Sequence, residues 1–224
     1  MRNYFIIIGL LLWSTGQATA QEDELFNNTK HRVGLISGCG CQNVNQLLTS
    51  INESHALVIK DYLNAKGIDP EQVGLNVEYD YQILFFQFQY YWAFLRKKSW
   101  GLDLVVQPQY NLTKFKIEDN PNELKGYELG VNAGVMIRKN LFKDRLSIYS
   151  IISAGPHYLS GCPERQSKGF IFSDNLFAGL NLKLFKNTYL DFRPGFRHIS
   201  NASLSRPNGG LNNFVISAGV MHNL

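Results

Sequence analysis

The stretch YELGVNAGVMI, Tyr127–Ile137, alternates apolar side chains with small or polar ones. Apolar residues occupy the odd-numbered positions, and Glu128, Gly130, Asn132 and Gly134 lie between them. Successive side chains of a β-strand point to opposite faces, so this pattern predicts a strand with one apolar face and one small, polar face. The fold then depends on how often the pattern recurs.

The same period of two recurs along most of the chain. Each repeat places mainly Leu, Val, Ile, Phe or Ala on one face and mainly Gly, Asn, Ser or Gln on the other. The pattern blurs from Ile83 onward, which we interpret as one long strand with a β-bulge. The eight predicted strands cover His31–Gly40, Val73–Phe94, Trp100–Asn111, Tyr127–Ile137, Leu146–Gly155, Phe170–Leu182, Leu190–Asn201 and Phe214–Leu224.

Long and short connectors alternate between these strands. The long ones cover 41–72, 114–125, 159–169 and 202–212, and the short ones 95–99, 138–144 and 185–187. An even number of strands, with short turns at one end and long loops at the other, is typical of outer-membrane barrels. We therefore predict an all-β fold, an eight-stranded antiparallel up-and-down transmembrane β-barrel. Its extended first outer loop, at about 41–72, contains a predicted short helix near Val44–Leu63.

A soluble, lipocalin-like barrel is the alternative, because it also has eight strands but turns its apolar face inward. Such a protein would be a periplasmic lipid carrier. The polar face of the strands is rich in Gly, Asn, Ser and Gln and carries few lysines, whereas a surface exposed to water is usually rich in charge. Small side chains suit the narrow interior of an eight-stranded barrel. The membrane barrel is the favoured interpretation.

The first twenty residues have the pattern of a secretory signal peptide. A positively charged start at Arg2 precedes the apolar run Tyr4–Trp13, and Ala18-Thr19-Ala20 is a small-residue cleavage pattern. We expect residues 1–20 to be removed and residues 21–224 to form the barrel in the outer membrane of a Gram-negative cell. The net charge of +4 comes from lysines and arginines scattered among connectors, which gives no support to nucleic-acid binding.

The chain contains three cysteines, Cys39, Cys41 and Cys162. An oxidising compartment permits a disulfide that uses Cys162, and the sequence leaves the pairing open. No histidine pair follows Cys39 and Cys41 at zinc-ligand spacing, so we expect no metal site and no cofactor.

Two chemically reactive residues interrupt the apolar face of the seventh predicted strand. The alternation places His198 and Ser200 on the face that carries Phe192 and Phe196. If that face meets lipid, a base and a hydroxyl face the acyl chains near the outer loops. Exposing polar groups to lipid costs free energy, so we expect the two residues to have a function. Residues two apart on a strand lie side by side, so His198 can activate Ser200 as a nucleophile, and Asn201 can offer an amide to the oxyanion.

The stretch FRHISNASLSRPNGGLN, 196–212, resembles the C-terminal signature of the PagL-type lipid A 3-O-deacylases. The resemblance implies an eight-stranded outer-membrane serine esterase whose H-x-S-N-A motif faces lipid. It also implies hydrolysis of the ester-linked 3-O acyl chain of lipid A, with lipopolysaccharide of the outer leaflet as the partner. By position, His198 corresponds to the base, Ser200 to the nucleophile, and Asn201 and the backbone N–H of Ser203 to the oxyanion hole.

The chain departs from this family at two positions. Ser203 stands where the family usually has glycine, and Asn212, twelve residues after the serine, stands where the family has glutamate. An asparagine can orient the histidine but cannot supply negative charge to the imidazolium. The sequence therefore leaves three outcomes open. The activity is weakened, another carboxylate replaces the missing charge, or the activity is lost. The alternative function is a non-catalytic outer-membrane barrel with a structural or adhesive role.

Overall fold

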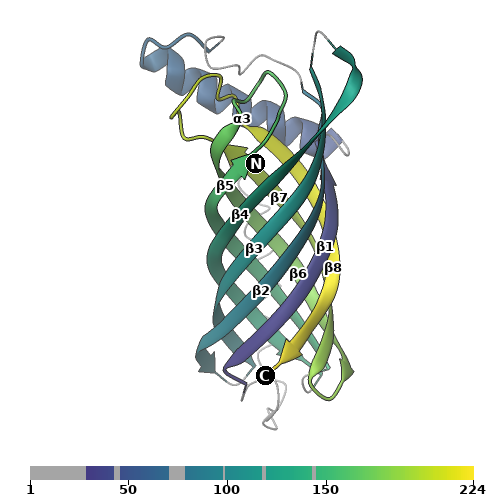
Figure 1. Cartoon of the computed structure of the whole chain (residues 1–224). Helices are drawn as coiled ribbons and strands as arrows, with labels where there is room; N and C mark the ends of the chain where they lie inside the picture. Colours follow the sequence, from purple (N-terminus) through teal and green to yellow (C-terminus); the bar gives the residue numbers. More distant parts are fainter. Residues whose placement is uncertain (1–28, 43–45, 71–78, 98, 118–119, 143–144) are drawn as a thin grey trace.

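The structure, a computed structural model, describes residues 29–42, 46–70, 79–97, 99–117, 120–142 and 145–224. The predicted signal peptide and the stretch 73–78 of the second predicted strand lie outside the described residues. The described strands pair with their neighbours in the chain, and the first pairs with the last, which closes an antiparallel barrel (Figure 1). They are β1 (His31–Cys41), β2 (Tyr81–Lys97), β3 (Trp100–Ile117), β4 (Asn120–Leu141), β5 (Leu146–Leu159), β6 (Gly169–Phe185), β7 (Thr188–Ser200) and β8 (Leu211–Asn223). The predicted barrel is confirmed.

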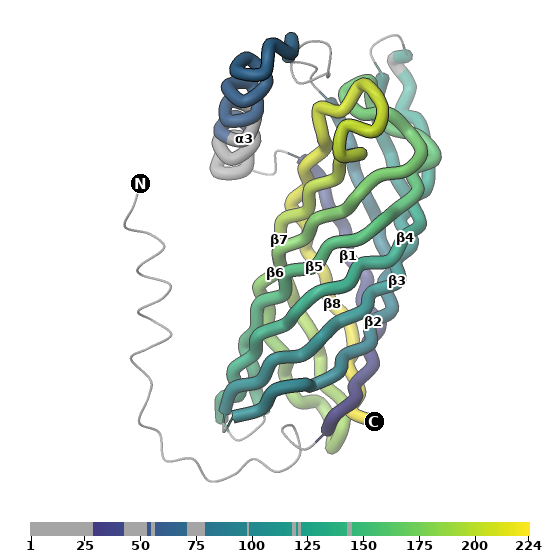
Figure 2. The backbone as a smooth tube through the Cα atoms, turned by 90° about the vertical axis from the view of Figure 1, so that its left-hand side faces the viewer, coloured from purple at the N-terminus to yellow at the C-terminus, as the bar shows by residue number. Residues whose placement is uncertain are grey.

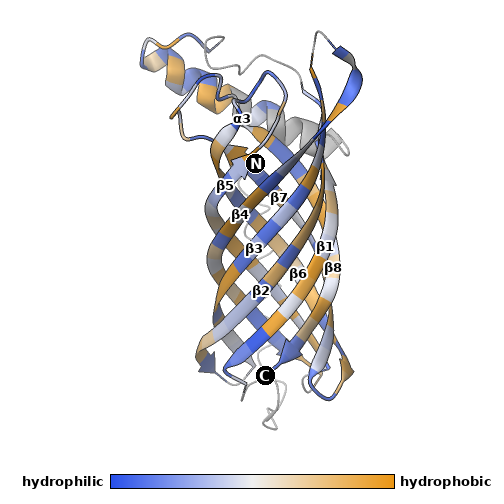
Figure 3. Ribbon diagram, viewed as in Figure 1, coloured by the Kyte–Doolittle hydropathy of each residue, from blue (hydrophilic) through white to orange (hydrophobic). Residues whose placement is uncertain are grey.

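The alternation of the sequence sorts the side chains between the lumen and the outside. In β2, Leu84, Phe86 and Phe88 are exposed on the outer face, while the alternate residues Phe85, Gln87 and Gln89 are buried in the lumen. Figure 3 shows apolar residues distributed over the barrel strands. An apolar exterior around an interior that holds the charged and most of the amide side chains is the arrangement of a barrel in lipid and the reverse of a soluble carrier. The favoured interpretation is thus confirmed.

Charged side chains in the lumen contact charges of opposite sign, and two of the arginines share one aspartate. Four arginines are almost completely buried there, and each is compensated by a carboxylate that points inward from the same or another strand. Pairing is required, because an isolated buried charge is strongly destabilising. The buried pairs are Arg32–Asp103, Arg138–Asp103, Arg193–Asp191 and Arg197–Glu128.

The connectors place the loops that matter for the site at one end of the barrel. β6 and β7 are joined by only Lys186 and Asn187, whereas 160–168 and 201–210 form longer loops at the opposite end. One predicted long loop is wrong: 114–125 is mostly an extension of the β3–β4 hairpin, with Lys114 paired to Lys125. Its polar composition hid the strand pattern, because this part of the hairpin does not need an apolar outer face.

The first long connector contains helix α3 (Gln46–Ala65), close to the predicted range. It lies beside the long-loop end of the barrel in both views (Figures 1 and 2). Leu57, Val58 and Tyr62 are exposed on it. No helix in the described part of the chain is both long and apolar enough to cross a membrane.

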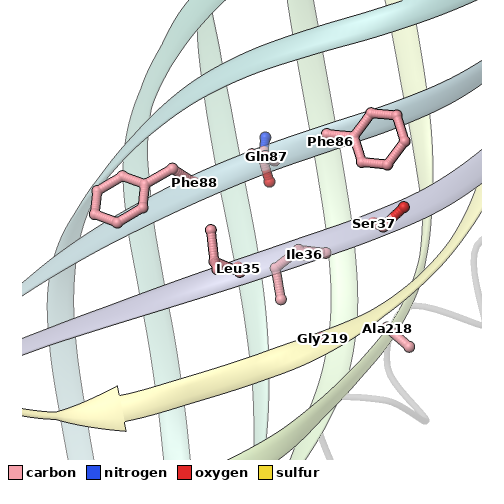
Figure 4. A pocket seen from close by; sticks show the side chains of 8 residues that line it. All are labelled: Leu35, Ile36, Ser37, Phe86, Gln87, Phe88, Ala218 and Gly219. Carbon is pink, nitrogen blue, oxygen red and sulfur yellow. The ribbon is translucent and has the colours of Figure 1, made fainter.

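A shallow hollow lies on the outer surface of the barrel, where β1, β2 and β8 adjoin (Figure 4). It forms because Ser37 and Ala218, which are paired across β1 and β8, leave space beside the rings of Phe86 and Phe88. The remaining lining residues are Leu35, Ile36, Gln87 and Gly219. None of the predicted catalytic residues lines this hollow, so it is separate from the site described next.

Candidate active site

His198 and Ser200 both lie on the outer face at the long-loop end of β7. The strand alternates regularly there, with Arg197 and Ile199 almost completely buried in the lumen while His198 and Ser200 are half-buried on the other face. Since residues two apart share a face, the imidazole and the hydroxyl are neighbours on the outside of the barrel. Both groups therefore face away from the lumen, on the same side of the barrel wall as the apolar side chains.

Asn212 holds the imidazole from the neighbouring strand. β7 and β8 pair His198 directly with Asn212, and His198 Nδ1 lies 2.6 Å from Asn212 Oδ1. An amide oxygen only accepts hydrogen bonds, so Nδ1 carries the hydrogen and donates it. The lone pair is then on Nε2, which is the tautomer that a general base needs.

The chain turns sharply immediately after Ser200. Ala202 has a φ of 51° and Ser203 a φ of 64°, so two consecutive residues other than glycine adopt the left-handed region. Each such residue costs on the order of 1 kcal/mol, and strain of this kind is concentrated at functional sites. The glycine that the family usually has at the position of Ser203 would relieve part of this cost.

Asn201 is fully buried and is held by the surrounding loops. Its Nδ2 lies 2.6 Å from Ser167 Oγ and 2.8 Å from Ser205 Oγ, and its main-chain N–H donates to Asn208 Oδ1 at 2.8 Å. Ser203 contributes its hydroxyl to the same cluster, 3.4 Å from Asn208 Nδ2. Asn201, the predicted oxyanion-hole residue, thus links the loop after β5 to the loop after β7 through its side-chain amide.

Asp174 is a functional candidate that the sequence interpretation did not include. It pairs with His198 across β6 and β7, and it is exposed on the outer face. Directly paired side chains on one face lie about 4.5–5.5 Å apart at Cβ. A carboxylate on an otherwise apolar face is costly, and the break that it makes in the pattern of β6 was the signal that could have revealed it.

Gly210 packs against the ring of His198 from the loop before β8. Its φ is +69°, and a Cβ built at this position would lie 2.6 Å from His198 Cε1. Only glycine combines that backbone conformation with such a close approach. Gly210 therefore packs directly against the imidazole and limits its movement on that side.

If His198 acts as the predicted base, Gly210→Ala is expected to lower kcat about tenfold or more, because a displaced catalytic group loses its alignment. The measurement is kcat of the purified protein in detergent. Gly67→Ala is the matched control, since Gly67 has a φ of +67° and nothing within 4 Å of the added Cβ. Equal kcat values for the two variants would contradict a specific effect on His198.

The family comparison matches the part of the chain that forms this site. A sequence profile described as "Lipid A 3-O-deacylase (PagL)" matches residues 76–221, which is more than half of the chain. The chain belongs to the PagL family. This PagL family member is a closed eight-stranded β-barrel, and the family resemblance inferred from residues 196–212 is confirmed. Comparison with curated proteins gives no match.

This PagL family member is similar to solved structures, and one of them, with a TM-score above 0.5, supports the fold. The crystal structure of the outer membrane enzyme PagL is similar over 84% of this chain and 97% of that chain, with 13% identity and a TM-score of 0.51. Neisserial surface protein A covers 87% of this chain and 96% of its own, with 10% identity and a TM-score of 0.43. At such identities the likeness concerns the fold, and the chemistry has to be argued from the residues.

Proposed function

We propose that the protein is a serine esterase of the outer membrane that removes the ester-linked 3-O acyl chain of lipid A. The observation that carries the proposal is the pair His198 and Ser200 on the lipid-facing side of β7, with the imidazole held by Asn212 at 2.6 Å. A serine beside a histidine that a third group orients can act as a nucleophile with its general base, and this supports the proposal. Family membership supplies the substrate class.

In the first half of the reaction, Ser200 Oγ attacks the carbonyl carbon of the ester while His198 Nε2 takes the hydroxyl proton. The tetrahedral intermediate collapses, the bond between the acyl carbon and the sugar oxygen breaks, and His198 returns its proton to that oxygen. Water then attacks the acyl group on Ser200 in the same way and releases the fatty acid. No metal or cofactor enters this sequence, because a side-chain base and water balance every proton.

The oxyanion is proposed to be stabilised by the Ser203 backbone N–H and by Asn201. The Asn201 amide donates to the hydroxyls of Ser167 and Ser205. To stabilise the oxyanion, it gives up one of these hydrogen bonds and donates to the substrate oxygen instead. Hydrogen bonds of a catalytic site often tighten only when the substrate is bound. Asp174 is proposed to supply, on the outer face, part of the negative charge that Asn212 lacks.

The test is mass spectrometry of lipid A from a Gram-negative host with and without the protein. Expression is expected to produce lipid A that lacks one hydroxyacyl chain, with the chain lost from the ester-linked 3-position, as fragmentation of the product would establish. An unchanged lipid A profile from cells whose outer membrane contains the folded barrel would contradict the proposal. That result would favour a structural or adhesive barrel.

A further inference from the structure

A tyrosine takes the place of a missing strand beside Asn212. β1 ends at Cys41, which pairs with Phe214, so β1 does not extend as far as Asn212 on β8. The main-chain N–H of Asn212 donates to Tyr79 Oη at 2.9 Å, and Tyr79 Oη donates to the Asn212 carbonyl oxygen at 3.3 Å. One hydroxyl thus satisfies both main-chain groups of the residue that holds His198.

The segment that contains Tyr79 is itself tied to the barrel. Gln42, directly after β1, donates from Nε2 to the carbonyl oxygen of Tyr79 at 2.5 Å and accepts from the N–H of Tyr81 at 2.9 Å. Asn213 Nδ2 donates to the carbonyl oxygen of Tyr81 at 2.9 Å. Gln42 therefore fixes the main chain at Tyr79 and Tyr81, and Asn213 fixes it again at Tyr81.

Arg165 connects the two sides of the site. Its guanidinium lies 5.2 Å from the centre of the Tyr79 ring, in a cation–π contact. Its Nε donates to the carbonyl oxygen of Gly210 at 2.8 Å and to that of Gly209 at 3.2 Å. Since Gly210 packs against His198 and Tyr79 bridges Asn212, one buried arginine contacts both segments that fix the imidazole.

The environment of Tyr79 favours the neutral hydroxyl over the phenolate. Burial raises the pKa of its hydroxyl above the ordinary value, although the bond from Asn212 and the charge of Arg165 act in the opposite direction. The neutral hydroxyl can both donate and accept, which is what bridging the two main-chain groups of Asn212 requires.

We propose that Tyr79 and Arg165 are positioning residues for the esterase reaction, which fix Asn212 and, through it, the orientation of the His198 ring. The inference rests on the proposed function. It follows from the identity of residue 212: a neutral amide holds an imidazole by one hydrogen bond and not by charge. The orientation of His198 then depends on where the backbone carries Asn212, and Tyr79 and Arg165 determine that position.

The first test is Tyr79→Phe, which removes only the bridging hydroxyl. In purified protein, with 3-O-acylated lipid A as substrate, kcat is expected to fall about tenfold while KM stays within about twofold, because alignment and not binding is lost. Tyr149→Phe is the control. Tyr149 also donates from a buried hydroxyl, to Asp191 at 2.7 Å, but in the lumen. A similar fall in both variants, or no fall in either, would overturn the proposal.

A double-mutant cycle separates positioning from a general structural effect. If Tyr79 acts through Asn212, then Tyr79→Phe introduced into Asn212→Ala costs less than about twofold, because the group that it positions is already absent. Losses that multiply in the double variant would show that Tyr79 acts elsewhere and would overturn the proposal.

A readout without substrate keeps this inference distinct from the proposed function. In protein with ¹⁵N-labelled histidine, His198 is expected to show the tautomer with hydrogen on Nδ1, and its signal is identified from His198→Gln. Tyr79→Phe and Arg165→Lys are each expected to add the tautomer with hydrogen on Nε2. If the variants show this added tautomer but the wild-type protein does not hydrolyse lipid A, the positioning role is supported and the proposed esterase function is rejected. An unchanged tautomer in both variants would overturn positioning.

Discussion

Ser200→Ala is expected to lower kcat for deacylation by about 10⁴-fold or more, because it removes the atom that forms the covalent intermediate. Loss of the nucleophile or of the base from a catalytic triad costs nearly as much as loss of the whole set, since the residues act as one unit. Ser200→Ala combined with His198→Ala is therefore expected to be no slower than Ser200→Ala alone. The measurement is release of fatty acid from 3-O-acylated lipid A by the purified barrel.

The chain offers a matched control for this substitution. Ser150 also lies outside the lumen, on β5, and its hydroxyl donates to the carbonyl oxygen of Phe177 at 3.0 Å. Ser150→Ala removes the same atoms from the outer face of another strand and is expected to keep kcat within about twofold, as surface substitutions distant from a site usually do. A Ser200→Ala variant that retained more than a tenth of wild-type activity would disprove covalent catalysis by this serine.

Asn212→Asp is expected to raise kcat by about 10- to 10³-fold. The reverse change in a Ser-His-Asp protease lowers turnover about 10⁴-fold, largely through the wrong tautomer, which gives the upper limit. We expect a smaller gain, because Asn212 Oδ1 already accepts from His198 Nδ1 at 2.6 Å and because Asp174 lies across the strand from His198. Aspartate has the shape of asparagine, so the substitution changes charge and leaves the packing unaltered.

The control for this second prediction is Asn212→Leu, which keeps a similar volume and removes the acceptor. It is expected to lower kcat about tenfold or more, since nothing then selects the Nδ1–H tautomer. The measurement is the initial rate of the wild type, Asn212→Asp and Asn212→Leu at saturating lipid A. An aspartate variant that is no faster than the wild type would show that charge at position 212 does not limit the reaction.

The barrel was predictable because a strand has only two faces. Period-two alternation gave the eight strands without reference to any contact, and it placed His198 and Ser200 outside by counting from Leu190. The hairpin at 114–125 was missed because β3 and β4 extend there beyond the part of the barrel with an apolar outer face. Neither face has to be apolar in that part, so the alternation disappears.

The surroundings of the site were less predictable, because they come from connectors. Tyr79 reaches Asn212 from 133 positions away, and Arg165 reaches Gly210 from 45 positions away. No local pattern relates such residues; closure of the barrel brings them together. The structure leaves Cys39, Cys41 and Cys162 as free thiols, and the disulfide that the sequence left open is not formed.

Buried side chains fill the lumen, so the proposed reaction reaches His198 and Ser200 from the lipid side. Its substrate would then arrive by two-dimensional diffusion within one leaflet. The rate consequently follows the mole fraction of lipid A around the protein and not its total concentration in the suspension. Neighbouring lipids that carry no 3-O ester slow the enzyme by dilution alone, so the composition of the cell surface itself sets how fast that surface is remodelled.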